Sequence, residues 1–439
     1  MLRLRAILFA AVFFIAACGQ SKKVEFSNQQ IRETVTSMTD IMVHDITNPP
    51  LAARFFSYSL LSGYEIISKH DSTIPSMKGR INEYPDITHQ VPAEEFDYRL
   101  SALLAMMETS KKMQPSGARM DAWQKKFIDS CIREGVDEDV MKASLGYAQS
   151  ISKQMLDYAK KDGYNKISNL PRYTPSKEPG TWYPTPPGFI AAVEPYFNKV
   201  RPFTLDSCNQ FKPEQPAPYS KDTTQEFYKM VSAVYRESQS GNQTNQEIAA
   251  FWDCNPFNLN DKGHLQFAYK KISPGAHWLG ITGIACGDAK KSFNESWKIH
   301  TIVAIGLMDG FMACWDEKFR SNRIRPETAI RQMIDPSWSP FLQTPPFPEY
   351  LSGHSTISFT SATILTSFFG DGFKYTDRVE VPYGLPERKF NSFLDAAEEA
   401  GLSRFYGGIH FMDAITNGAK QGKEVGQWVL NRMSHVSEK

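Results

Sequence analysis

Three short clusters near the C-terminal end of the sequence combine polar side chains with signals for helix boundaries. They span Lys318 to Pro326, Ser352 to Ser355 and Ser403 to Asp413. A helix N-terminus offers unpaired N–H groups and the positive end of the helix dipole, so a Ser-Gly turn at that point suits the oxygens of an anion. If the clusters meet in the fold, they form a pocket for a tetrahedral oxyanion.

Basic side chains in these clusters can neutralise such an anion. Lys318, Arg325 and Arg404 carry positive charge, and the two arginines can make bidentate contacts to oxygen atoms. Pro326 directly after Arg325 is typical of the first residue of a helix. Taken alone, a basic residue near a helix end commonly just complements the helix dipole. The joint occurrence of these features in this order favours a site.

Two histidines in the clusters can take part in chemistry. His410 can act as a nitrogen nucleophile or as a ligand if Asp413 or a backbone carbonyl fixes its tautomer. His354 is then available for acid–base work. The simpler interpretation of the run 352–354 is a helix cap followed by a surface histidine.

Together the clusters resemble the three-part signature shared by vanadium-dependent haloperoxidases and type 2 phosphatidic acid phosphatases. The resemblance covers residues 315–413 and implies a helical-bundle core around a vanadate or phosphate ion. It implies that the ion is held by Lys318, Arg325, Ser352, Gly353, His354, Arg404 and His410. It also implies that His410 bonds to vanadium, or forms a phosphohistidine in a phosphatase, and that His354 is the acid–base residue. One position departs from the pattern, because Leu351 stands where the family usually has proline.

Two aromatic residues bear on which activity is present. Trp315 and Phe347 stand at positions that resemble those of aromatic residues beside the vanadate in haloperoxidases, and phosphatases of the superfamily generally lack this pair. We therefore take them as candidates for a halide pocket, although they could be ordinary core aromatics. Asp316 and Asp413 are candidates for supporting positions next to the site.

The pattern of apolar residues predicts an all-α fold with a helical-bundle core. Helical spacing dominates from residue 29 to about 164 and returns at 223–238, 246–253, 278–289, 293–320, 355–369, 392–401 and 413–433. Eleven of the 27 prolines lie between residues 171 and 218, which excludes long helices there. We expect a helical region over 29–170, a Pro-rich aromatic segment packed on the core over 171–222, and the core with the active site over 223–433.

The first residues of the chain read as an export signal. Arg3 and Arg5 precede an apolar run that ends in a small-residue pair before Cys18, a pattern that resembles the lipobox of bacterial lipoproteins. We expect a signal peptide over 1–17, a tether over 18–28, and a lipid on Cys18 that holds the protein at the periplasmic or outer cell surface. An ordinary secretory signal is the alternative. The most apolar later stretch, 301–315, is predicted to be a buried core helix that is too short to span a bilayer.

The net charge argues against a nucleic-acid-binding protein, and the cysteine spacing argues against a structural metal site. With 49 basic against 48 acidic side chains, the chain has no field to attract nucleic acid. The five later cysteines, at 131, 208, 254, 286 and 314, show no zinc-binding spacing, so we predict mostly buried thiols and no structural metal site. The histidines outside the clusters are predicted to be structural or exposed.

Three functions compete at this point. The first is a lipid-anchored vanadium-dependent haloperoxidase that resembles the bacterial iodide-oxidising members, in which Lys318 polarises hydrogen peroxide for attack by halide. The second is a soluble periplasmic acid phosphatase that works through a phosphohistidine at His410. The third is a non-catalytic surface lipoprotein that binds phosphate or a glycan, which the full set of cations and histidines disfavours. Iodide is the expected halide because it is the most easily oxidised, and the organic acceptor is left open.

Overall fold

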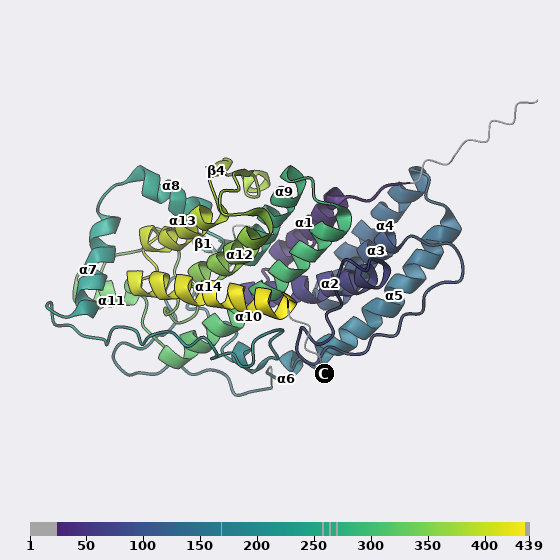
Figure 1. The fold of residues 1–439 in the computed structure, drawn as a ribbon. Helices are drawn as coiled ribbons and strands as arrows, with labels where there is room; N and C mark the ends of the chain where they lie inside the picture. Colours follow the sequence, from purple (N-terminus) through teal and green to yellow (C-terminus); the bar gives the residue numbers. More distant parts are fainter. Residues whose placement is uncertain (1–23, 168, 257–258, 263–264, 269–270, 435–439) are drawn as a thin grey trace, which may run out of the picture.

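The computed structural model describes residues 24–167, 169–256, 259–262, 265–268 and 271–434. The predicted signal peptide, Cys18 and the first part of the tether lie outside the described residues. The molecule is elongated, with the N-terminal helices at one end and the C-terminal helices at the other (Figure 1). The fold is a helical bundle, as the sequence predicts.

The N-terminal region consists of helices that pack side by side. They are α1 (Asn28–His44), α2 (Pro49–His70), α3 (Tyr98–Met113), α4 (Gly117–Arg133), α5 (Glu138–Lys160) and the short α6 (Tyr164–Ile167). Most begin with the capping chemistry expected for a helix start: Ser27 and Gln30 form a capping box at α1, and Asp97 and Asp137 cap α3 and α5.

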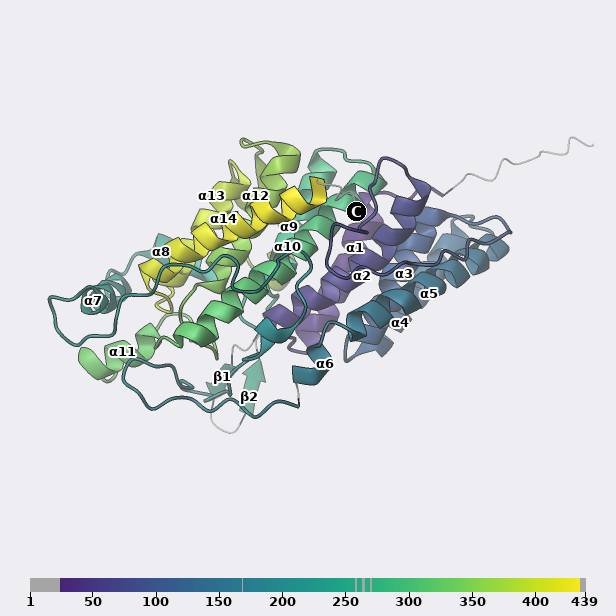
Figure 2. The same cartoon turned by 60° about the horizontal axis from the view of Figure 1, so that its bottom comes forward.

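The C-terminal region contains the remaining elements. They are two 3₁₀ turns, at Phe197–Lys199 and Val381–Tyr383, and the helices α7 (Glu226–Ser238), α8 (Gln243–Phe251), α9 (Pro274–Asp288), α10 (Phe293–Ser321), α11 (Pro326–Met333), α12 (Gly353–Phe369), α13 (Phe393–Tyr406) and α14 (Met412–Ser434). Two small antiparallel hairpins interrupt the helices, β1 (Leu259–Lys262) with β2 (Leu265–Ala268) and β3 (Tyr375–Asp377) with β4 (Arg388–Phe390). Figure 2 shows the first hairpin beside the loops below α10.

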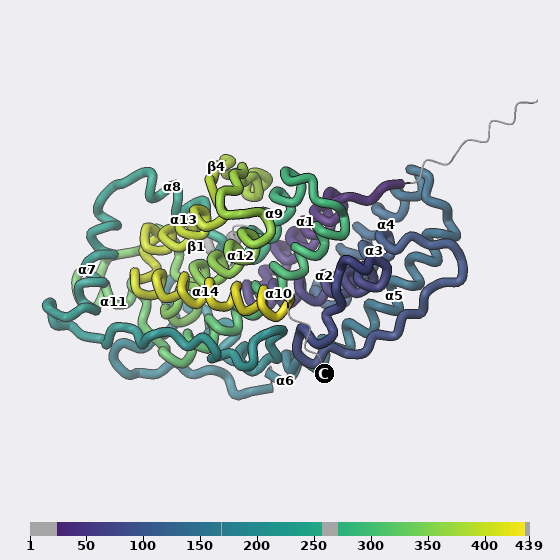
Figure 3. Tube along the Cα trace, viewed as in Figure 1, coloured from purple at the N-terminus to yellow at the C-terminus, as the bar shows by residue number. Residues whose placement is uncertain are grey.

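Helix α10 is a long buried helix in the centre of the molecule, and its C-terminal end carries Trp315 and Lys318. It lies between the N-terminal helices and the C-terminal layer of α12 and α14, as the trace in Figure 3 shows. By length and composition it could cross a membrane, since its most apolar 18 residues have a mean hydropathy of 1.2. However, 94% of that stretch is buried inside the protein. The helix spans the whole of the stretch 293–320 predicted to be helical, and its predicted burial over 301–315 is confirmed, but it is longer than the segment judged too short for a bilayer.

Glycines on α14 bring it unusually close to α12. Gly418, Gly422 and Gly426 lie four residues apart and face α12, and a Cβ atom on Gly422 would stand 2.3 Å from the Thr356 carbonyl oxygen. The same approach allows the Thr360 hydroxyl to donate to the Gly422 carbonyl at 3.1 Å. The close contact fixes the N-terminal end of α12 against the start of α14, where two of the predicted site clusters lie.

The Pro-rich segment is tied to α10 through a buried carboxylate. Asp309 accepts hydrogen bonds from the backbone N–H groups of Phe203 and Thr204, each at 2.7 Å, and from the Thr204 hydroxyl at 2.6 Å. Burial raises the pKa of Asp309 to about 6, partly offset by these hydrogen bonds. The segment therefore packs on the helix that carries Trp315 and Lys318.

Candidate active site

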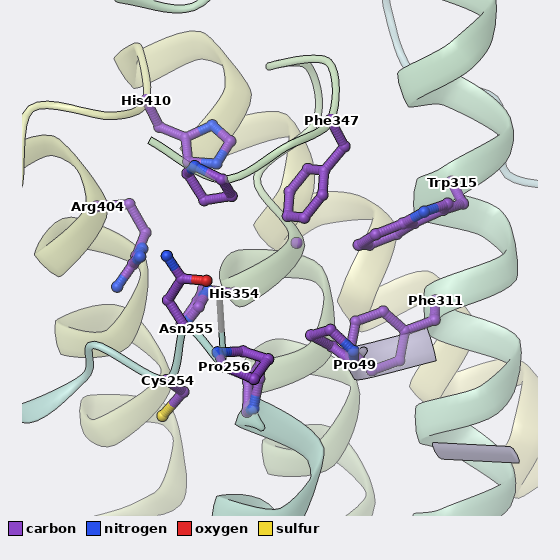
Figure 4. A pocket seen from close by; sticks show the side chains of 13 residues that line it. Pro49, Cys254, Asn255, Pro256, Phe311, Trp315, Phe347, His354, Arg404 and His410 are labelled. Atoms are coloured by element: carbon purple, nitrogen blue, oxygen red, sulfur yellow. The ribbon is translucent and has the colours of Figure 1, made fainter. Parts of the chain in front are cut away.

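Five helix ends meet around one pocket. The C-terminal ends of α10 and α13 and the N-terminal ends of α11, α12 and α14 carry the three predicted clusters. The pocket has about 430 Å³ of empty volume, its open mouth included. Its lining contains Gly353, His354, Arg404 and His410 together with Trp315 and Phe347. Figure 4 shows the polar side chains on one side of the pocket and the aromatic rings on the other.

Several buried nitrogen atoms at this place have no hydrogen-bond partner among the described residues. They are Arg325 Nη2, Arg404 Nε and Nη2, and His354 Nε2. Arg404 Nη2 lies 3.9 Å from Asp253, beyond hydrogen-bond distance. Buried N–H groups of arginine are rarely left unsatisfied, because each costs free energy. The arrangement therefore fits an anion with several oxygen atoms.

His410 is held in one tautomer by Glu349. Its Nδ1 lies 2.8 Å from Glu349 Oε1, and its Nε2 lies 3.1 Å from Arg325 Nη1. An ionised carboxylate accepts and an arginine donates, so Nδ1 carries the proton and Nε2 carries the lone pair. Burial lowers the pKa of His410 well below its usual value, and the charge of Arg325 adds to this. The ring is thus a neutral imidazole with a ligand atom at Nε2.

The sequence analysis considered Asp413 for this supporting role and did not identify Glu349. The structure places Asp413 on Arg323, which it binds through both carboxylate oxygens. Arg323 also donates from Nε to Glu349 at 2.7 Å, and Glu349 accepts from the backbone N–H of Phe411 at 2.9 Å. Asp413 therefore acts on His410 only through Arg323. One feature of the sequence could have pointed to Glu349: it is the acidic residue in the stretch 345–350, just before the cluster at 352–354.

His354 occupies the second position of α12. Burial, together with the charge of Arg404, lowers the pKa of His354 well below its usual value, and an interaction with the Trp252 backbone offsets this only in part. The Nε2 atom of His354 is buried and has no hydrogen-bond partner among the described residues. The Trp252 carbonyl accepts from Arg404 Nη1 at 2.8 Å. One backbone group outside the three clusters thus positions two of their side chains.

The N-terminus of α12 presents backbone rather than side-chain donors to the pocket. The Ser352 hydroxyl accepts from the Ser355 N–H at 3.3 Å and so serves as the N-cap. Gly353 and His354, the first residues of the helix, have N–H groups without partners within the helix. A Cβ atom on residue 353 would lie 3.6 Å from the Trp315 ring. Ser352 therefore shapes the helix end, and Gly353 keeps its surface open.

Lys318 is fully buried and lies behind the pocket. Its Nζ donates to the carbonyl oxygens of Pro348 at 3.0 Å and Glu349 at 3.2 Å, and also to that of Leu351. Burial, together with the charge of Arg325, lowers the pKa of Lys318 to about 7. Lys318 thus stabilises the loop before α12. In this loop Leu351 stands where the resemblance led us to expect proline, and the Tyr350–Leu351 peptide bond is cis.

The two aromatic candidates lie together on the pocket wall. The ring centroids of Trp315 and Phe347 are 4.9 Å apart, and Phe311 adds a third ring beside Trp315. Asp316 does not join them, because its carboxylate binds Asn198 at 2.9 Å and Arg320 at 3.3 Å. The apolar wall is therefore formed by α10 and the loop before α12.

The segment after α8 closes the pocket on the side opposite α10. Cys254, Asn255 and Pro256 are among its lining residues. Cys131, Cys208, Cys254, Cys286 and Cys314 are all buried free thiols, as predicted.

Comparison with known proteins places the chain in a family. A family model described as the VCPO second helical-bundle domain matches residues 298–439. The crystal structure of the first bacterial vanadium-dependent iodoperoxidase is 39% identical, with a TM-score of 0.89, and the alignment covers 96% of this chain and 100% of that one. A bacterial vanadium-dependent chloroperoxidase in its holo form is 14% identical with a TM-score of 0.63, covering 89% and 94%. A search among curated proteins finds no match.

The class defined by this fold and pocket is a helical-bundle oxyanion-binding enzyme. The chain belongs to the vanadium-dependent haloperoxidase family. Its own residues fit vanadate: the buried arginine N–H groups without partners suit the oxygens, and His410 Nε2 offers a nitrogen ligand.

The role of Glu349 can be tested by substitution. We expect Glu349→Gln to weaken orthovanadate binding about 10- to 100-fold, because the hydrogen bond that orients His410 loses its charge. Binding can be measured by titrating the purified protein with orthovanadate in a calorimeter. Asp413→Asn is the matched control and should have a smaller effect, because Asp413 contacts Arg323 and not His410. Equal losses in the two variants would contradict the assignment.

Proposed function

We propose that this protein binds vanadate and uses hydrogen peroxide to oxidise iodide to a hypoiodous acid equivalent. The observation that carries the proposal is the set of buried arginine N–H groups and the His354 Nε2 atom, all without partners, around a histidine whose tautomer is fixed by Glu349. The relative that is 39% identical over 96% of the chain is an iodoperoxidase, which supports the choice of halide.

The residues of the pocket have different roles in binding the anion, providing a ligand and transferring a proton. When bound, vanadate supplies an electrophilic centre that activates hydrogen peroxide for attack by a halide ion. Arg325 and Arg404 hold the negative charge of the cofactor, and His410 provides the ligand nitrogen. Burial keeps His354 neutral, so it can accept a proton from peroxide and return it to the product.

The apolar wall supports iodide as the substrate. Iodide is the largest and most weakly hydrated of the common halides, so it loses the least hydration free energy beside the Trp315 and Phe347 rings. It also gives up electrons more easily than bromide or chloride. We therefore expect weak or absent bromide oxidation and no chloride oxidation.

A paired assay distinguishes this function from the acid phosphatase alternative. The vanadate-loaded protein should oxidise iodide in the presence of hydrogen peroxide, measured as triiodide absorbance. His410→Ala should abolish the reaction, and Arg404→Ala should weaken vanadate binding about 10- to 100-fold through loss of a charge-assisted contact.

Exposed His44 offers a matched control, and His44→Ala should keep full activity. The vanadate-free protein is tested in parallel for hydrolysis of nitrophenyl phosphate. Hydrolysis of the ester without any iodide oxidation after vanadate loading would decide for the phosphatase.

We further propose that the protein is exported and anchored by a lipid on Cys18, at the periplasmic or outer cell surface. The support is the sequence pattern of Arg3, Arg5, the apolar run and the small residues before Cys18. Cys18→Ser should release the protein from the membrane fraction or leave its signal uncleaved, as measured by fractionation and mass spectrometry. A processed Cys18→Ser protein that still sediments with membranes would overturn the anchor.

A further inference from the structure

A second buried cluster of metal-ligating side chains lies next to the oxyanion pocket. Cys254 follows α8, His277 lies in the first turn of α9, and Glu380 precedes the 3₁₀ turn at Val381–Tyr383. All three are buried, and their ligand atoms lie within 4.8 Å of one another. Cys254 is 23 positions from His277 and 126 from Glu380, so no local spacing in the sequence brings them together. His277, which the sequence predicted to be structural or exposed, is buried and has two potential ligand partners.

The separations within this cluster match one face of a tetrahedral zinc site. Cys254 Sγ is 3.6 Å from His277 Nδ1 and 3.7 Å from Glu380 Oε1, and His277 Nδ1 is 3.4 Å from Glu380 Oε1. Zinc–ligand distances of about 2.3 Å to sulfur and about 2.0–2.1 Å to nitrogen or oxygen place tetrahedral donors about 3.3–3.6 Å apart. One ion can therefore reach all three atoms with little movement of the side chains.

The other ring nitrogen of His277 is held by a carboxylate. Asp377 Oδ2 lies 2.7 Å from His277 Nε2, and the Val379 N–H donates to Asp377 Oδ1 at 2.9 Å. A histidine that binds a metal through one nitrogen commonly donates from the other to a carboxylate, which fixes its tautomer and raises its basicity. The Asp377 contact thus directs the lone pair of a neutral His277 toward Cys254 and Glu380.

The charge of the cluster also suits a divalent cation. Two buried carboxylates, Asp377 and Glu380, face His277, and without a metal ion only an imidazolium within the cluster offsets them. Replacing the imidazolium proton and the thiol proton of Cys254 by one Zn²⁺ leaves the total charge unchanged. The cluster can therefore bind the ion without an added buried charge.

We propose that Cys254 Sγ, His277 Nδ1 and Glu380 Oε1 bind a Zn²⁺ ion, at a site that adjoins the oxyanion pocket and uses none of the residues proposed to hold the anion. A thiolate, an imidazole and a carboxylate in tetrahedral spacing form a donor set that zinc accepts, whereas magnesium and calcium prefer oxygen ligands alone. The proposal does not depend on the halide or on the presence of vanadate.

Zinc at this site would stabilise a segment that contacts the oxyanion pocket. The Trp252 ring stacks on His277 with centroids 4.7 Å apart, and the Trp252 carbonyl accepts from Arg404. Cys254 itself lines the pocket. An ion on Cys254 and His277 would fix the segment that positions Arg404 and His354, so zinc acts on the oxyanion pocket by positioning and not by chemistry.

Metal binding by the full-length protein tests the proposal directly. Vanadate-free protein is stripped with a chelator, dialysed against Zn²⁺ and analysed by mass spectrometry for metals, with one Zn²⁺ per chain expected. The Co²⁺ form should show a sulfur-to-cobalt charge-transfer band and the intense visible bands of tetrahedral cobalt. Cys254→Ser should lose the charge-transfer band, and Asp377→Asn should weaken Zn²⁺ binding about 10- to 100-fold.

Cys131→Ser is the matched control, because Cys131 is also a buried free thiol but lies on α4. It should bind Zn²⁺ and Co²⁺ as the wild type does. The proposal fails if the wild-type protein binds no stoichiometric Zn²⁺, or if Cys254→Ser keeps the charge-transfer band. If Cys254→Ser does not fold, the wild-type cobalt spectrum decides, since the absence of a thiolate band there also overturns the site.

Discussion

Several basic side chains are buried around one small pocket, and keeping them there shapes the surrounding helices and loops. Lys318, Arg325 and Arg404 are fully buried or nearly so. Burial lowers the pKa of Lys318 to about 7 and that of Arg325 to about 9, which expresses the free-energy cost of keeping them charged. An oxyanion bound by the unpaired N–H groups of Arg325 and Arg404, in front of Lys318, offsets that cost. The site is therefore most stable when it holds its anion, and the fold supplies the rigidity that keeps the charges together.

Glu349 is the group that allows this arrangement to exist before the anion binds. It is fully buried and joins Arg323, His410 and the Phe411 backbone, so it neutralises part of the charge and sets the tautomer of the ligand histidine. Lys318 stabilises the loop that carries Glu349 by donating hydrogen bonds to three of its backbone carbonyl oxygens. The close contact of α12 with α14 then brings His354 and the start of α14 to the same pocket.

The helical class and the three clusters could be predicted because their signals are local. Pro326 does begin α11, and Ser352 caps α12, since capping and helix periodicity act over a few residues. The partners of the site could not be predicted in the same way. Glu349 reaches His410 across 61 positions and the Trp252 carbonyl reaches Arg404 across 152, and such pairs are set by helix packing. Asp413 was a reasonable candidate by spacing, but Arg323 occupies its carboxylate.

If the buried charges form one oxyanion site, His410 Nε2 is its nitrogen ligand. A crystal structure of the orthovanadate-soaked protein, with vanadium located by anomalous scattering, tests it most directly. We expect a single vanadium atom within bonding distance of His410 Nε2, with its oxygens contacting Arg325 Nη2 and the Arg404 side chain. Vanadium bound elsewhere, or held in this pocket without a bond to His410, would show that His410 is not the ligand.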